Sequence, residues 1–255
     1  MVHRTPVEAL AEDQRVLGIK YGTAYYHCLQ EFWRVSSNWD RYEALFGSRE
    51  RVALLNSSSG HFWYTIQNLL FDHVLLGICR LTDPARMMGR DNICVETLAQ
   101  LDPTRHKAQL VRRAAKARQK TEFARTWRHK RIGHNDLEQL SGIANLLTPA
   151  TRRKVSDALV AIHDVLRWVQ GRYFDGDLLL TEIGDDDANQ LLIALARAES
   201  LLETERREIE NGNYRSILDR RIRYPSADYG KERRYAGSTR LKRPSPYRGK
   251  LPLPT

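Results

Sequence analysis

The 255-residue sequence has few cysteines and no long apolar run, and each absence excludes whole classes of protein. Its cysteines, Cys28, Cys79 and Cys94, form no CxxC pair, so neither a zinc module nor a disulfide scaffold is expected. The most apolar stretch, residues 62–81, is interrupted by polar and charged side chains that a bilayer would not accept. Because the N-terminus also lacks an apolar signal segment, we expect a cytoplasmic protein without a membrane partner.

Motifs for nucleotide binding, nucleophilic hydrolysis and zinc catalysis are also lacking. There is no Gly-rich phosphate loop, no Ser-His-Asp order and no HExxH segment. Asp72 and His73 have no second histidine three or four residues away, which favours a buried, hydrogen-bonded histidine over a metal ligand. Three consecutive aspartates at 185–187 are expected to cap the helix that follows them. The sequence therefore predicts neither a metal site nor a cofactor.

Positive charge, by contrast, is abundant, and it is confined to two segments. The formal net charge is +10, from 41 Lys and Arg against 31 Asp and Glu. Residues 103–134 carry a net +10 and residues 215–255 a net +9, so the rest of the chain is acidic. Clustered positive charge is typical of proteins that bind a phosphate backbone. The alternative is a solvated helix face and a solubilising tail, and composition alone leaves both open.

Apolar periodicity predicts an all-α fold. Apolar residues recur at three- and four-residue steps in segments that we expect to be helices, at residues 7–46, 61–81, 103–140, 149–173 and 188–210. No hairpin signal such as Asn-Gly between alternating strands is present, and the one candidate strand, residues 178–183, has no partner.

Start and stop signals set the expected helix limits. Proline disfavours a helix in the residue before it and is accepted at the first helical position. The expected signals are a break at 56–60, an end at Asp83-Pro84, starts at Asp102-Pro103 and Thr148-Pro149, a break near Thr121, and a stop at 211–213.

The composition changes after Tyr214. Residues 215–255 contain five of the nine prolines and four tyrosines, with little apolar periodicity. Such a segment buries too little apolar surface to offset its ordering entropy. We therefore expect one helical domain over residues 1–212 and a basic, mostly disordered tail over residues 213–255. The tail suits single-stranded nucleic acid, because tyrosine stacks on bases, or it is an uncommitted flexible terminus.

The candidate site lies in the most basic part of the chain, at residues 126–136 (TWRHKRIGHND). Metal-free cleavage of a phosphodiester needs a side chain with a pKa near 6.5 to move protons and a planar cation to hold the phosphate. Histidine and arginine meet these needs, and Arg128, His129 and His134 supply them. On an ideal helix Arg128 and His134 diverge by about 120°. They act on one phosphate only if the helix bends near Gly133 or a second subunit completes the site, which predicts a symmetric homodimer.

The run from Arg128 to His134 resembles the signature of the HEPN superfamily, in which an arginine and a polar residue precede a histidine by a few positions. The helix end Arg80-Leu-Thr-Asp-Pro84 and residues 92–98 are similar to the branch of U-type abortive-infection (Abi) phage-defence proteins. The resemblance covers roughly residues 7–210. Gly133 stands where that branch leads us to expect alanine.

The resemblance implies an all-α HEPN domain that dimerises and acts as a metal-independent endoribonuclease, in phage defence or as the toxin of a toxin–antitoxin system. By that analogy His134 exchanges protons with the ribose 2′-hydroxyl or the leaving oxygen, and Arg128 holds the scissile phosphate. His129 orients Arg128 or assists proton transfer. The products would carry 2′,3′-cyclic phosphate and 5′-hydroxyl ends. Asn135 and Asp136 stand where some HEPN proteins carry a tyrosine for nucleotidyltransferase modification.

Lys130, Arg131 and Arg125 are the residues expected to bind RNA. Besides RNA, the expected partners are a second copy of the chain and an antitoxin or other defence-system protein. Two alternatives remain: a non-catalytic HEPN module that binds RNA or a partner protein through its basic helix, and a structural all-α protein anchored to nucleic acid by its tail. Arg80 and Asp83 either pair with each other or face the same cleft as His134.

Overall fold

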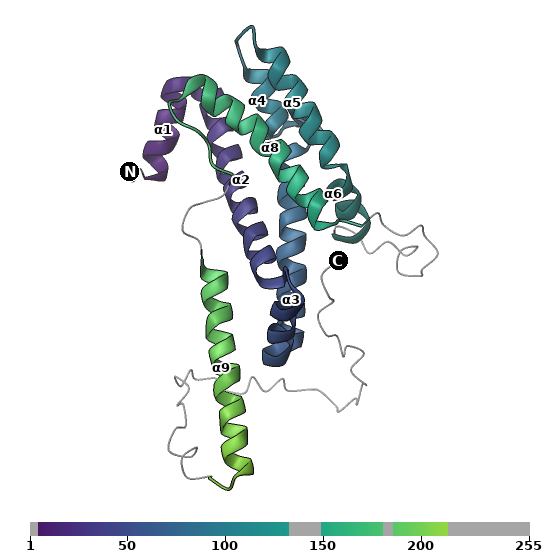
Figure 1. The fold of residues 1–255 in the computed structure, drawn as a ribbon. Helices are drawn as coiled ribbons and strands as arrows, with labels where there is room; N and C mark the ends of the chain where they lie inside the picture. The colour runs from purple at the N-terminus through teal and green to yellow at the C-terminus, as the bar shows by residue number, and fades with distance from the viewer. Residues whose placement is uncertain (1–4, 133–148, 181–185, 214–255) are drawn as a thin grey trace, which may run out of the picture.

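The computed structural model describes residues 5–132, 149–180 and 186–213, and in these ranges the chain is almost entirely helical (Figure 1). The predicted all-α class is confirmed. Helices α2, α3 and α8 run side by side through the body, α4 and α5 cover one end, and α9 lies beside the other (Figure 1). The elements are α1 (Pro6–Leu17), α2 (Ile19–Phe46), α3 (Arg49–Thr82), β1 (Arg86–Met87), β2 (Arg90–Asp91), α4 (Val95–Leu101), α5 (Lys107–Lys120), α6 (Glu122–Trp127), η1 (Arg128–Ile132), α8 (Arg152–Tyr173) and α9 (Asp187–Glu210).

The first predicted helix is in fact two helices, α1 and α2, joined at Gly18. Gly18 has a φ of +83°, a value that favours glycine, and it lets α1 fold back on α2. The two helices pack so closely that a Cβ on Gly22 would lie 2.4 Å from the carbonyl oxygen of Asp13. The apolar period continues across this reversal, so periodicity alone predicted one long helix.

The predicted break at residues 56–60 is a kink inside α3. Ser59 has non-helical backbone angles (φ −165°, ψ 73°), and helix continues on both sides of it. The helical turns from Arg49 to the kink were not predicted. At the other end, α3 stops at Thr82 as expected, because Pro84 holds Asp83 in an extended conformation (φ −64°, ψ 160°).

The segment after α3 departs from the prediction in two ways. A short antiparallel hairpin, β1–β2, turns through Met88 and Gly89, which both have positive φ, and no Asn-Gly signal marks it. Asp102 closes α4 instead of starting the next helix, and its Oδ1 accepts hydrogen bonds from the amide and hydroxyl of Thr104 at 2.7 and 2.6 Å. Helix α5 therefore begins only at Lys107, and the predicted start at Asp102-Pro103 is wrong.

The predicted break at Thr121 is confirmed, because Thr121 ends α5 and directly precedes the first residue of α6. Beyond Trp127 the helix widens into the π-helical turn η1. Helix α8 begins at Arg152, where the side chain of Thr151 accepts a hydrogen bond from the amide of Lys154, a few residues after the predicted start. It ends at Tyr173, as predicted.

Most of the core lies between α2, α3, α4, α5 and α8. The predicted apolar stripe of α8 is buried there, at Val155, Leu159, Ile162, Leu166 and Val169. A smaller cluster joins α9 to α2 and α3 through Ala188 and Leu192. Leu191 and Leu201, predicted on the apolar side of α9, are 40% and 41% exposed, because the side of α9 that packs on the body carries Ala188, Leu192 and the partly buried Leu195.

The structure also bears on the cysteines, the end of α9 and the candidate strand. All three cysteines are buried and free. Asn211 ends α9 and Gly212 follows with a φ of +81°, which confirms the predicted stop. Residues 178–180 form no strand, and residues 181–183 of the candidate strand lie outside the described ranges. The tail from 214 to 255 and the segment 133–148, which contains His134, also lie outside them. None of the described helices is long and apolar enough to cross a membrane.

Candidate functional site

The candidate site is built where the end of α3 meets the π-helical turn η1. Arg128 is the first residue of η1, and its Nη1 lies 2.6 Å from Oδ2 of Asp83, the residue that closes α3. The two side chains are only 23% and 12% exposed, so water screens the pair weakly. The π-helical geometry bonds i to i+5 and is frequent at functional sites. The ideal-helix angle between Arg128 and later residues therefore does not apply inside this turn.

Arg128 is held from two sides. Burial lowers the pKa of its guanidinium, but the hydrogen bond to Asp83 and the negative charge of that carboxylate outweigh burial, so the pKa is raised overall. The side chain is thus a permanent cation. Its Nη2 lies 3.4 Å from Nε2 of His129. This contact is what the expected orienting role of His129 requires.

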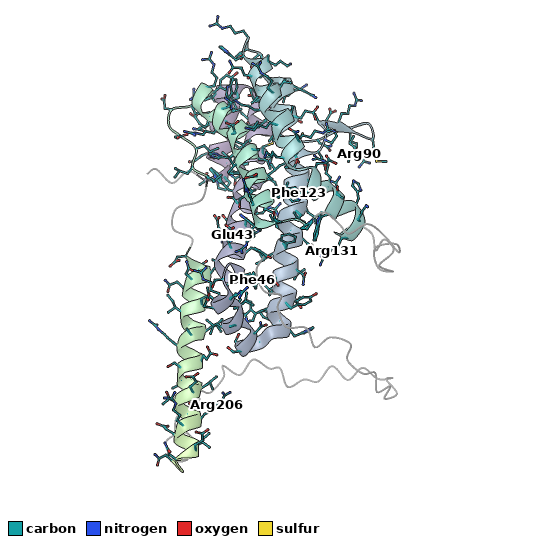
Figure 2. The ribbon with its side chains drawn as sticks, turned by 45° about the vertical axis from the view of Figure 1, so that its right-hand side comes forward. Glu43, Phe46, Arg90, Phe123, Arg131 and Arg206 are labelled. Carbon is teal, nitrogen blue, oxygen red and sulfur yellow. The ribbon has the colours of Figure 1, made fainter. Side chains whose placement is uncertain are left out.

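His129, Lys130 and Arg131 lie on the exposed side of η1. The Arg131 guanidinium sits 5.0 Å from the centre of the Trp127 ring, a cation–π arrangement. Trp127 in turn meets Phe71 of α3 edge to face at 5.7 Å, which anchors the turn to the body. Figure 2 shows Arg131 beside α3, at the end of the α6–η1 segment. The turn therefore presents positive charge to solvent next to Arg128.

Arg125 lies inside the protein, although it was expected to bind RNA. The residue is 9% exposed. Its guanidinium donates to the hydroxyls of Thr82 and Thr121, both at 3.2 Å, to the Glu122 carboxylate at 2.9 Å, and to the carbonyl of Arg118. It ties α3, α5 and α6 together. We therefore assign Arg125 a structural role in place of the predicted RNA contact.

Arg80 and Asp83 do not pair with each other. Arg80 Nε lies 2.8 Å from Glu31 Oε1 of α2, whereas Asp83 binds Arg128. Although they are only three residues apart on α3, each finds a partner on another segment. The predicted pair between Arg80 and Asp83 is therefore wrong, and Asp83 instead faces the segment that carries Arg128. The sequence signal for Asp83 was its place before the proline that ends α3.

His73 is hydrogen-bonded, as expected, but it is half-buried where a buried histidine was expected. Its Nε2 lies 2.9 Å from Nη1 of Arg34. Burial, and then the positive charges of Arg34 and Arg80, lower its pKa, with Glu31 opposing them. In the described ranges no three His, Cys, Asp or Glu side chains gather as a metal site.

Of the three consecutive aspartates, Asp186 and Asp187 lie within the described ranges. Asp186 directly precedes the first turn of α9, and its carboxylate accepts hydrogen bonds from the side-chain amides of Asn189 and Gln190. Asp186 thus holds the N-cap position, but its carboxylate accepts from side-chain amides and not from backbone N–H groups of the first turn, so the expected side-chain cap does not form. The helix begins at Asp187, one residue before the predicted start.

Three of the six cations of α5 contact acidic neighbours. Arg113 pairs with Asp164 of α8 at 2.6 Å, and Lys120 and Arg118 contact Asp157 and Glu96 at 3.5 and 3.6 Å. The positive segment 103–134 thus has two parts. Its α5 half fits the solvated, ion-paired helix face, while its η1 end keeps exposed cations beside the buried Arg128–Asp83 pair.

The all-α bundle, with Arg128 and the polar His129 at the start of η1, is consistent with a HEPN-type domain. A family model, HEPN_AbiU2 (AbiU2), matches residues 23–191. Because the match covers more than half of the chain, the protein belongs to the AbiU2 family, an abortive-infection HEPN domain. The resemblance noted from the sequence is therefore confirmed. Neither a curated protein nor a solved structure matched the chain.

Proposed function

We propose that this protein is a metal-independent endoribonuclease of HEPN type that acts in phage defence or as the toxin of a toxin–antitoxin system. The observation that carries the proposal is the held guanidinium of Arg128, 2.6 Å from Asp83 and in contact with His129, beside the exposed Lys130 and Arg131. A cation fixed in this way is ready to stabilise charge that builds on a phosphate without first having to reorganise.

Asp83 leaves part of the Arg128 guanidinium available. An arginine carries five N–H donors in one plane, and the carboxylate engages Nη1. The remaining donors would hold the non-bridging oxygens of the scissile phosphate, more tightly as negative charge develops. Lys130 and Arg131 would hold neighbouring phosphates. Asp83 acts as a positioning residue, because it touches Arg128 and not the RNA.

The chemistry proposed is transfer of the phosphate to the 2′-hydroxyl. The 2′-oxygen forms a bond to phosphorus and gives up its proton to a base, while the bond to the 5′-oxygen breaks and that oxygen takes a proton from an acid. The products end in a 2′,3′-cyclic phosphate and a 5′-hydroxyl. We assign a proton transfer to His134, which lies outside the described residues, and the second one to the same residue of a second copy in a homodimer.

The test is incubation with total RNA in EDTA, followed by analysis of the new ends. His134→Ala should lower cleavage by roughly 10²–10⁴-fold with little change in RNA affinity, and Arg128→Ala should harm both. Arg112→Ala is the matched control, because Arg112 is an exposed cation of α5 and should leave turnover unchanged. Cleavage that EDTA abolishes and a divalent ion restores would refute the mechanism.

The second candidate function is a non-catalytic module that binds RNA through η1. The observation in its favour is that Asp83 already neutralises Arg128, while Lys130 and Arg131 are exposed. Wild-type protein that binds RNA without cleaving it, and that His134→Ala leaves unchanged, would support this second candidate.

A further inference from the structure

A second group of cations lies on α3 and α2, one helical turn from the Arg128–Asp83 pair. His73, Arg80 and Asp83 are separated by seven and three residues, spacings that keep them on one side of α3. Arg128 meets this side at Asp83, and α2 meets it at Arg80 and His73. From His73 to Asp83 the helix rises roughly 15 Å. The polar side of α3 therefore connects η1 with α2.

One carboxylate holds both arginines of this group. Glu31 accepts from Arg80 Nε at 2.8 Å and from Arg34 Nε at 3.1 Å, and Arg34 Nη2 also pairs with it. Both guanidiniums are nearly half exposed, at 48%, whereas Glu31 is 19% exposed. We call Glu31, Arg34, His73 and Arg80 the α2–α3 cluster. With a neutral His73, it keeps a net charge of +1.

The cluster lies next to the Arg128 site along α3, because Arg80 is three residues before Asp83, the partner of Arg128. Burial raises the pKa of the Cys79 thiol to about 11, while the positive charges of Arg128, Arg125 and Arg80 oppose that rise. Cys79 directly precedes Arg80, and its backbone carbonyl accepts a hydrogen bond from the amide of Asp83, the residue that closes α3. Arg80 and Arg128 therefore both act on the last turn of α3.

On the α2 side the cluster borders an open groove of about 460 Å³. Its lining includes His27, Gln30, Glu31, Arg34, Ser37 and Arg41, all from α2. These side chains are mostly hydrogen-bond donors and cations. Beyond Arg34 the lining continues along α2 to a second arginine, Arg41.

We infer that the α2–α3 cluster binds the backbone of single-stranded RNA next to the phosphate that Arg128 holds. This inference rests on the proposed function for the place where the strand is cut. Two successive phosphates replace the Glu31 carboxylate, one on the exposed edge of Arg80 and one on that of Arg34, while Glu31 keeps both guanidiniums ordered in the free protein. The strand then runs from η1 across α3 and along the groove of α2.

The test compares Arg34→Gln, Arg80→Gln and the double variant, in a His134→Ala background so that the RNA stays intact. Each lost phosphate contact should flatten the slope of log affinity against log salt by roughly 0.7, and the double variant by about 1.4. Arg112→Gln on α5 is the matched control and should leave the slope unchanged. Thermal unfolding establishes that each variant is folded.

Two further measurements separate RNA binding from a purely structural clamp between α2 and α3. Glu31→Gln removes the competing carboxylate and should tighten RNA binding, whereas a clamp predicts lower stability with unchanged affinity. A complex of His134→Ala with 4-thiouridine RNA should crosslink to residues 27–41, and this measurement needs no variant within the cluster. An unchanged slope in the folded double variant, or crosslinks confined to η1, overturns the inference.

These results also separate the inference from the proposed function. RNA affinity that depends on Arg34 and Arg80 in a protein that never cleaves RNA would refute the nuclease and support the strand path. Cleavage that persists while Arg34→Gln and Arg80→Gln bind RNA as the control does would refute the path alone.

Discussion

Asp83→Asn should both destabilise the protein and slow RNA cleavage, because it keeps the shape of the side chain but removes the charge that holds Arg128. The 2.6 Å pair is 12% and 23% exposed, so it lies between a surface pair, worth about 0–1 kcal/mol, and a fully buried pair, whose disruption costs about 3–5 kcal/mol. We expect the free energy of unfolding to fall by about 1–3 kcal/mol. In a protein of this size that lowers Tm by about 2–10 °C.

A double-mutant cycle measures the pair itself. Denaturant unfolding of Asp83→Asn, Arg128→Gln and the double variant should give a coupling energy of about 1 kcal/mol or more. Asp157→Asn is the matched control, since its 3.5 Å contact with Lys120 is half exposed and should cost at most about 1 kcal/mol. A coupling energy below about 0.5 kcal/mol would refute the assignment of Asp83 as the residue that holds Arg128.

Cleavage kinetics then test the positioning role. A loosened Arg128 still attracts RNA but stabilises the transition state less, so Asp83→Asn should lower kcat more than it raises KM. The double variant should cleave no more slowly than Arg128→Gln alone. A destabilised Asp83→Asn protein with unchanged kcat would show that the pair serves stability only.

Two other predictions follow from the contacts of single residues. Arg125→Gln should lower the free energy of unfolding by about 2–4 kcal/mol, because it leaves buried partners unsatisfied. Lys130→Gln should keep the wild-type stability and weaken RNA binding. The opposite pattern would show that Arg125 contacts RNA. Burial and the charges of Arg34 and Arg80, opposed by Glu31, lower the pKa of His73, so the unfolded chain binds the proton first. As the pH falls below about 6.5, the wild type should therefore lose more free energy of unfolding than His73→Gln does. Urea unfolding at pH 7 and pH 5 tests this, and equal losses in the two proteins would contradict it.

Local signals in the sequence were sufficient for the all-α class and for many helix ends. Pro84 ends α3, Thr121 breaks the basic helix, and the apolar stripe of α8 is buried. The same signals misplaced other boundaries, since an Asp-Pro pair follows a helix as readily as it precedes one. Asp102 caps the end of α4, and the reversal at Gly18 leaves the apolar period unbroken.

The sequence also singled out Arg128 within its basic segment, because residue type and spacing are local properties. Which partner each charge meets was decided only by tertiary structure. Arg125, three residues away in the same segment, turns inward to Thr82 and Thr121, while Asp83 binds Arg128 and leaves Arg80 to Glu31. A helix places neighbouring side chains on different faces. The carboxylate that each arginine reaches therefore depends on how α2, α3 and η1 pack, and no local sequence pattern records that packing.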